Sequence, residues 1–86
     1  MATEPRTTEK KAQDYEVMGH SVVLINIISN GSDPSYKENL TAEELKNSVS
    51  RNVEHLETMV AREDWGSEDM APSEAAIIKG KAYVAS

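Results

Sequence analysis

The sequence of 86 residues contains no cysteine, only two histidines and only four glycines. Without cysteine it can form neither a disulfide nor a cysteine-ligated zinc site, which are common supports of small domains. Four glycines leave little material for a phosphate-binding loop, and no nucleophile elbow or paired-histidine zinc motif is present. The sequence therefore predicts no cofactor, no metal site and no enzymatic activity.

Basic residues are also scarce, because nine lysines and arginines stand against fifteen acidic residues and give a net charge of −6. The longest basic cluster is the pair Lys10 and Lys11, so the surface is poorly suited to a phosphate backbone and we expect no nucleic-acid partner. The longest apolar run, residues 22–28, is interrupted by Asn26 and is far shorter than the roughly 20 residues of a membrane span. The amino terminus lacks the pattern of a secretory signal. We expect a soluble cytoplasmic chain with no membrane partner.

The length of the chain corresponds to one small domain. A domain of this size buries only about 60% of the surface of its unfolded chain, so its stability is marginal. Since the usual covalent and metal supports are missing, we expect it to be stabilised by self-association or by a larger partner.

The clearest element is a helix over residues 42–64. Thr41, followed three residues later by Glu44, forms a capping box. Arg62 lies in the last predicted turn, and Gly66 follows where a left-handed cap is common. One apolar stripe runs along this helix at spacings of three and four residues. It consists of Leu45, Val49, Val53, Leu56, Met59 and Val60.

The carboxy-terminal residues 73–86 favour a second helix, with Ser73 as its N-cap and with Ala76 and Gly80 four residues apart on one face. A strand is the alternative, because residues 77–84 can also be divided into two alternating faces. If the segment is helical, Gly80 allows another helix to approach closely. The small-residue face of Ala76 and Gly80 is therefore a predicted contact surface.

The stretch HSVVLINIISNG, residues 20–31, is the most apolar part of the chain. Its β-branched residues favour a strand by propensity, but a strand needs a neighbour for its backbone groups, and the chain offers only the ambiguous carboxy-terminal segment. We favour a helix that ends at Gly31, although Gly19 argues against an early start. Its predicted inward stripe is Tyr15, Met18, Val22, Ile25 and Ile28.

Three further apolar residues, Val23, Leu24 and Ile27, lie off this inward stripe. A helix that is apolar on most of its sides is covered on more than one side. We therefore expect these three residues to face something outside the chain.

Together these elements predict a mainly α fold, a single small helical domain of two to three helices over residues 13–86. A charged amino-terminal arm, residues 1–12, precedes it, because its residues are too polar to join a core. The alternative is an α+β fold with residues 21–29 as a strand. Residues 30–40 and 65–72 are expected to be polar connections.

Few residues suggest chemistry. Glu54 adjoins His55 and so points about 100° away around the helix, which favours a surface role for His55, and His20 is expected to be structural. The segment REDWGSED, residues 62–69, is acidic but lacks the spacing of a calcium-binding loop, so we expect a solvated turn. Trp65 within it either closes the end of a helix pair or anchors an interface.

The segment ENLTAEELKNSVSRNVEHLETMVAREDW, followed by AAIIKGKAYVA, resembles small uncharacterised proteins of tailed bacteriophages, in particular marine and cyanobacterial ones. The resemblance rests on the capped helix with its RNVEHL stretch and on the terminal segment with its central glycine. It implies a viral setting, in which small acidic chains are virion components, assembly factors or inhibitors of a host protein. It identifies no binding residue.

The sequence thus predicts a non-enzymatic structural or assembly protein that acts through protein–protein contacts, as a homo-oligomer or as a subunit of a larger assembly. In the viral setting it is expected in the host cytoplasm or in the virion. The alternative is a small acidic binding module that inhibits or adapts a host protein. The predicted partner-binding residues are Val23, Leu24, Ile27, Trp65, Ala76 and Gly80.

Overall fold

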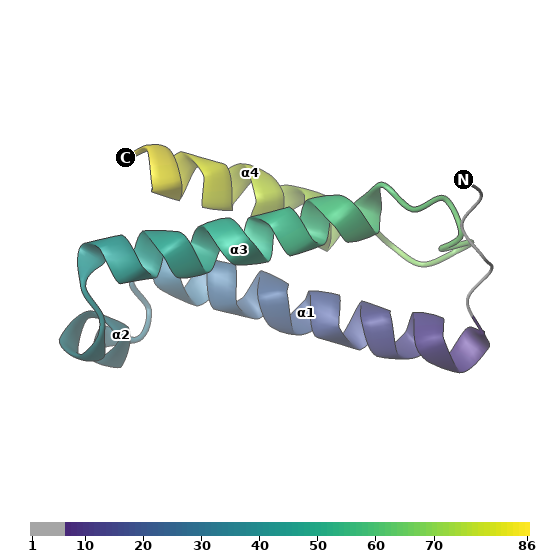
Figure 1. Ribbon diagram of the computed structural model, residues 1–86, viewed down its shortest axis with the longest axis horizontal. Helices are drawn as coiled ribbons and strands as arrows, with labels where there is room; N and C mark the ends of the chain where they lie inside the picture. The colour runs from purple at the N-terminus through teal and green to yellow at the C-terminus, as the bar shows by residue number, and fades with distance from the viewer. Residues whose placement is uncertain (1–6) are drawn as a thin grey trace.

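Four helices make up the computed structural model of the chain, which describes residues 7–86 apart from the side chain of Lys37. They are α1 (Thr8–Asn30), α2 (Pro34–Asn39), α3 (Ala42–Val60) and α4 (Ala71–Ala85), shown in Figure 1. Residues 7–86 contain no strand, so the prediction of a mainly α domain is confirmed. The strand alternatives for residues 21–29 and for the carboxy-terminal segment are wrong.

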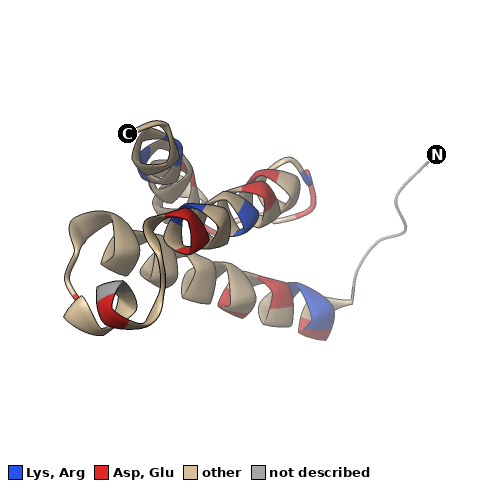
Figure 2. Ribbon diagram, turned by 60° about the vertical axis from the view of Figure 1, so that its left-hand side comes forward, with Lys and Arg blue, Asp and Glu red and all other residues tan. Residues whose placement is uncertain are grey.

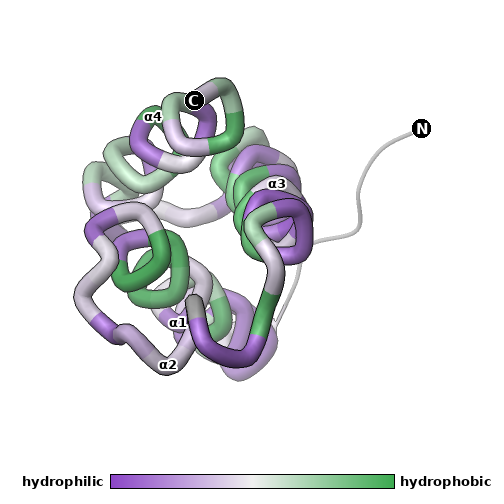
Figure 3. Tube along the Cα trace, turned by 90° about the vertical axis from the view of Figure 1, so that its left-hand side faces the viewer, coloured by the Kyte–Doolittle hydropathy of each residue, from purple (hydrophilic) through white to green (hydrophobic). Residues whose placement is uncertain are grey.

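The three long helices α1, α3 and α4 form a bundle in which each packs against the other two. In Figure 1, α1 and α4 run in the same direction and α3 runs in the opposite one. Figure 3 looks along the bundle and shows these helices around a common interior. The short helix α2 lies at the end where the chain passes from α1 to α3.

The helix α2 falls in the segment that the sequence predicts to be a polar connection. Asp33 caps it by accepting a hydrogen bond from the backbone N–H of Ser35 (3.0 Å), and Pro34 is its first residue. Proline suits this position because its missing N–H would have no partner in the first turn. Six residues of the connection are therefore helical rather than irregular.

The helix α1 begins earlier than predicted. Thr7 caps it by accepting a hydrogen bond from the backbone N–H of Lys10 (3.1 Å), and Lys10 forms an ion pair with Asp14 one turn later (3.0 Å). Residues 8–12 of the predicted arm are therefore helical, although most of their side chains are exposed. The rest of that arm, residues 1–6, lies outside the described residues. At the other end Gly31 adopts a left-handed φ of 64° and closes the helix, as predicted.

The helix α3 begins at the predicted capping box but ends at Val60 instead of residue 64. Trp65 folds back against the helix end, and its indole Nε1 donates a hydrogen bond to the carbonyl of Met59 (2.7 Å). In a longer helix this carbonyl would accept a bond from the N–H four residues later. Gly66 does have a left-handed φ of 66°, but it lies in the turn after Trp65 and is not the helix cap.

The helix α4 also begins earlier than predicted, at Ala71. Met70 occupies the N-cap position without a side-chain hydrogen bond, and the carboxylate of Asp69 accepts one from the backbone N–H of Ala71 (2.9 Å). Pro72 fits in the first turn for the reason given for α2. Ser73 is therefore not the N-cap but a buried residue inside the helix.

The core lies between the three long helices and uses the stripes that the spacing of apolar residues predicts. The buried hydrophobic residues are Met18, Ile25, Ile28, Leu45, Val49, Val53, Leu56, Trp65 and Ala76. Tyr15 and Val22 of the predicted α1 stripe, and Met59 and Val60 of the α3 stripe, are half-buried and pack against this core.

Gly80 of α4 packs closely against the other two long helices. A Cβ atom at this position would stand 2.4 Å from Cγ2 of Val53, 3.2 Å from Cγ1 of Val49 and 3.3 Å from Cγ2 of Ile25. These three side chains are β-branched, so few rotamers are open to them in a helix and they cannot easily turn away. The close helix contact predicted at Gly80 is therefore made within the chain.

We expect Gly80→Ala to lower the free energy of unfolding by about 1–3 kcal/mol, the usual cost of overpacking a core. Gly19→Ala is the matched control, because Gly19 also lies inside a helix but a Cβ there would meet nothing within 4 Å beyond its chain neighbours and the backbone of its own helix. The control should raise the free energy of unfolding by roughly 0.5–1 kcal/mol, since alanine favours helix. Urea unfolding followed by circular dichroism measures both changes. Equal effects would contradict the packing role of Gly80.

The capping box makes α3 sensitive to acid. The backbone N–H of Thr41 donates to the carboxylate of Glu44 (3.0 Å), and the hydroxyl of Thr41 accepts from the backbone N–H of Glu44 (3.1 Å). Hydrogen bonding with Thr41, chiefly with its backbone N–H and then with its side chain, lowers the pKa of Glu44. A carboxylate whose pKa is lowered by folding stabilises the protein above its unfolded pKa, and this contribution is lost as the pH falls through the folded pKa.

We expect Glu44→Gln to be less stable than the unaltered protein at neutral pH and equally stable in strong acid. Glutamine keeps an acceptor for the backbone of Thr41 but cannot carry the charge that strengthens the bond. Urea unfolding over a series of pH values measures the difference. Glu43→Gln, which removes the same charge from the same turn without touching the capping box, is the control. A Glu44→Gln effect that did not change with pH would contradict the prediction.

Candidate functional site

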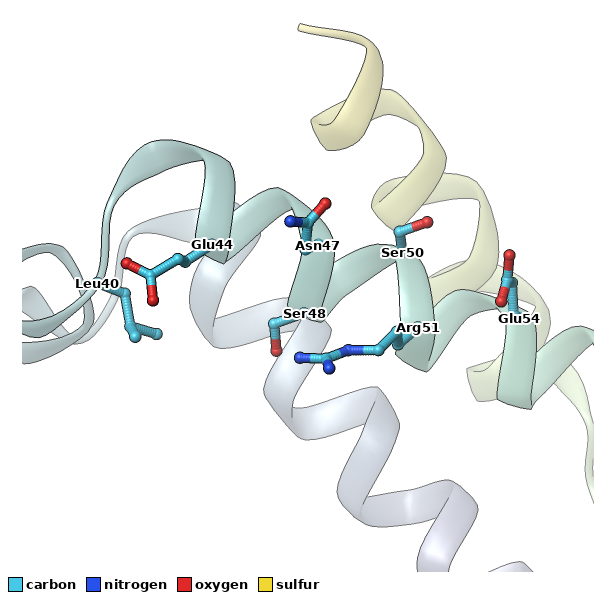
Figure 4. A pocket seen from close by; sticks show the side chains of 7 residues that line it. All are labelled: Leu40, Glu44, Asn47, Ser48, Ser50, Arg51 and Glu54. Atoms are coloured by element: carbon cyan, nitrogen blue, oxygen red, sulfur yellow. The ribbon is translucent and has the colours of Figure 1, made fainter.

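A shallow depression of about 480 Å³ lies along the outer side of α3. Figure 4 shows the side chains of Glu44, Arg51 and Glu54 extending from α3 around it. The complete lining is Leu40, Glu44, Asn47, Ser48, Ser50, Arg51 and Glu54. The lining contains no imidazole, the base that most often activates a serine hydroxyl as a nucleophile.

The two histidines lie outside this depression. His20 is exposed on α1, and His55 is half-buried on α3. The Nε2 atom of His55 is buried and has no hydrogen-bond partner in the part of the chain that the structure describes. A catalytic imidazole is oriented through one nitrogen and exchanges a proton through the other. The buried Nε2 of His55 meets neither requirement in this arrangement.

The acidic turn between α3 and α4 is attached to α1 through its backbone. The Nζ of Lys11 donates to the carbonyl of Asp64 (3.1 Å), and the hydroxyl of Tyr15 donates to the carbonyl of Asp69 (2.9 Å). Within residues 7–86 no group of three acidic or histidine side chains is placed to hold a metal ion. None of the four described helices has the length and apolarity needed to cross a membrane.

Three of the six predicted partner residues are buried within the chain. Trp65 is 6% exposed and closes one end of the bundle, with its ring 6.0 Å from the ring of Tyr15. Ala76 is 2% exposed, and Gly80 lies against α3 and α1. The contacts of these three residues are therefore made within the chain, and the residues are covered by it.

The other three predicted partner residues lie on α1 and differ in exposure. Val23 is 54% exposed and Ile27 is half-buried, whereas Leu24 packs against the core. Leu24 therefore does not point outward as the sequence analysis expects. The reason is that α1 contacts both α3 and α4, so its buried sector is wider than a single stripe.

The exposed side of α1 carries a row of residues that we call the α1 outer stripe. Its members follow one another at spacings of four, three, four and three residues, which places them on one side of a helix. They are Glu16, His20, Val23, Ile27 and Asn30. All are exposed except Ile27. Sequence reasoning found only the two apolar members, although the spacing that links all five is visible in the sequence.

Charge is distributed unevenly along this stripe. The sequence has no charged residue between Glu16 and Asp33, and Figure 2 shows the charged residues of α1 gathered in its amino-terminal part. At the carboxyl end, the Nζ of Lys79 on α4 donates to the Oδ1 of Asn30 (2.9 Å). The stripe therefore has a carboxylate near one end, an apolar centre at Val23, and an ammonium group at the other end.

Two other large hydrophobic residues are exposed, Val17 (47%) and Ile78 (72%). Ile78 stands on α4 beside Ala75 and Ala82, whose small side chains offer little contact area. Val17 lies six residues before Val23, which places it about 120° away around α1. Neither belongs to the α1 outer stripe.

No known protein family, curated protein or solved structure matches the chain. The resemblance to bacteriophage proteins therefore stays a prediction.

We expect Val23→Lys and Leu24→Lys, two neighbouring substitutions of the same kind, to act differently. Val23→Lys should change the free energy of unfolding by no more than about 0.5 kcal/mol, as is usual at the surface. Leu24→Lys should lower it by about 1 kcal/mol or more, because contact with the core is lost even if the lysine end reaches water. Thermal melts by circular dichroism compare the two at a concentration where each variant is monomeric. The reverse order would show that α1 is rotated from the orientation described.

Proposed function

We propose that the chain is a non-enzymatic structural or assembly protein that acts through protein–protein contacts made by the α1 outer stripe. The observation that carries the proposal is Val23, a branched apolar side chain that is 54% exposed in the middle of an uncharged stretch of an acidic protein. Such a side chain contributes little to the isolated domain but is removed from water on association. The centres of protein interfaces are also depleted of charged residues.

The size of the domain supports the same proposal. The chain has no disulfide, and its core lies between three helices of modest length. Small domains of this kind gain stability when a partner covers exposed apolar surface. In the viral setting that the sequence resemblance implies, such a protein would act in the host cytoplasm or in the virion.

The test compares Val23→Lys with Val17→Lys, which makes the same change on the same helix away from the stripe. The unaltered protein, expressed in its native source, should sediment with a larger assembly and faster than a chain of 9.5 kDa. Val23→Lys should move it to the position of the free chain, because the ammonium group of the lysine would have to be desolvated in the contact. Val17→Lys should sediment like the unaltered protein.

Sedimentation of the unaltered protein as a free chain at every concentration would contradict the proposal. An equal response to the two substitutions would also contradict it, since the contact would then not involve the stripe. Circular dichroism of each variant confirms that a change in sedimentation is not caused by unfolding.

The alternative proposal is a small acidic module that inhibits or adapts another protein. The depression on α3 supports it, because its lining carries two carboxylates, Glu44 and Glu54, against one guanidinium, Arg51, and could meet a basic surface. This function requires a single chain that is recovered with one partner. Glu54→Lys, rather than Val23→Lys, would then release the partner.

A further inference from the structure

We infer that the α1 outer stripe binds the same stripe of a second copy of the chain, with the two α1 helices antiparallel and centred on Val23. The inference depends on the proposed function, in which this stripe is a contact surface, and it identifies the partner. It requires a two-fold axis at the level of Val23, so that every contact away from the axis occurs twice.

The positions of the residues along the stripe are symmetric about Val23. Glu16 lies seven residues before Val23, and Asn30 lies seven residues after it. Seven residues correspond to two turns of helix and to about 10 Å along the axis. When two such helices pack antiparallel with Val23 against Val23, Glu16 of each copy therefore lies opposite Asn30 of the other.

The charges at these positions are complementary in the antiparallel arrangement. The ammonium group of Lys79 is held at Asn30, a neutral acceptor, by a hydrogen bond of 2.9 Å, and the side chain is exposed. By contrast, Lys10 and Lys81 form ion pairs with carboxylates of their own chain, Asp14 and Glu57. Lys79 is thus placed to meet Glu16 of the second copy, and the contact forms twice in the dimer.

A parallel arrangement of the same stripes would place Glu16 against Glu16 and Lys79 against Lys79, which is repulsive. Antiparallel packing also brings the positive amino end of each helix dipole toward the negative carboxyl end of the other. Most of the acidic side chains of the chain belong to α3 and to the turn that follows it, so a basic partner would be drawn to those elements rather than to the uncharged centre of the stripe. A second copy is therefore the occupant that the charge pattern favours.

The test exchanges the two charges. Glu16→Lys alone places two ammonium groups opposite each other at both ends of the contact, and Lys79→Glu alone places two carboxylates there. At low salt, the dissociation constant of each variant's dimer should be about tenfold higher than that of the unaltered chain. This is the scale expected when two exposed ion pairs are replaced by two contacts between like charges. Glu54→Lys makes the same change of charge on α3 and should leave the dimer unchanged.

Mixing the two weakened variants in equal amounts provides the sharper measurement. In a mixed dimer every pair is again of opposite charge, so the mixture should form dimers at concentrations where each variant alone is monomeric. The doubly substituted chain, Glu16→Lys with Lys79→Glu, should also recover dimerisation. Analytical ultracentrifugation of the full chains follows all of these species, and salt should reduce the differences between them.

The outcomes separate this inference from the proposed function. If the unaltered chain is monomeric up to roughly millimolar concentration while Val23→Lys still releases it from a larger assembly, the self-pairing is wrong and the contact role of the stripe stands. If the chain dimerises but the charge exchange and the mixture have no effect, the dimer uses another face and the inference is wrong. If the chain joins neither itself nor an assembly, the proposed function is wrong as well.

Discussion

The contact of Gly80 with Val53, Val49 and Ile25 fixes the distance at which α4 packs on α3 and α1. Because these three side chains belong to two different helices, one glycine determines two helix–helix separations at once. The other buried residues of α4 are Ser73 and Ala76, which are also small. The axis of α4 can therefore lie close to α1 and α3, but α4 contributes little side-chain volume to the core. The large apolar side chains of the core then come mainly from α1 and α3. This division of roles explains why α4 buries no large side chain, although it carries Ile77, Ile78 and Tyr83.

The sequence was sufficient to predict where most of the helices would be, but not where each of them would end. The stripe from Leu45 to Leu56 and the capping box at Thr41 depend on local spacing alone, and both are found where expected. The end of α3 involves a side chain from the following turn, whereas α4 begins two residues before the predicted N-cap, at a hydrogen bond from Ala71 to Asp69. The carbonyl of Met59 accepts hydrogen bonds from the backbone N–H of Arg62 (3.1 Å) and from the indole of Trp65 (2.7 Å), and α3 ends before the glycine signal at Gly66. A local pattern cannot reveal a cap that is supplied by a side chain folding back from the next turn.

The first helix shows a second limit of sequence reasoning. Its apolar residues occupy nearly every direction around the axis, so periodicity could not decide which of Val23, Leu24 and Ile27 would be covered. Only the positions of α3 and α4 show that Leu24 lies within the buried sector and that Val23 is outside it. The polar members of the α1 outer stripe were missed for a related reason. A role for Glu16 and Asn30 can be inferred only when the exposed side of α1 is known. It also requires the hydrogen bond that Lys79 of α4 donates to Asn30.

A chain with a net charge of −6 repels a second copy of itself at a distance, and any self-association has to overcome this repulsion locally. The α1 outer stripe can reduce this repulsion, because its centre is uncharged. Its one outward carboxylate, Glu16, is matched by the ammonium group of Lys79 at the opposite end. A hydrophobic contact at Val23 alone would be non-directional, since burial of apolar surface does not distinguish parallel from antiparallel helices. The pair formed by Glu16 and Lys79 does distinguish them. In such a dimer the apolar centre would supply most of the affinity, while the two charges would set the orientation and exclude the parallel form.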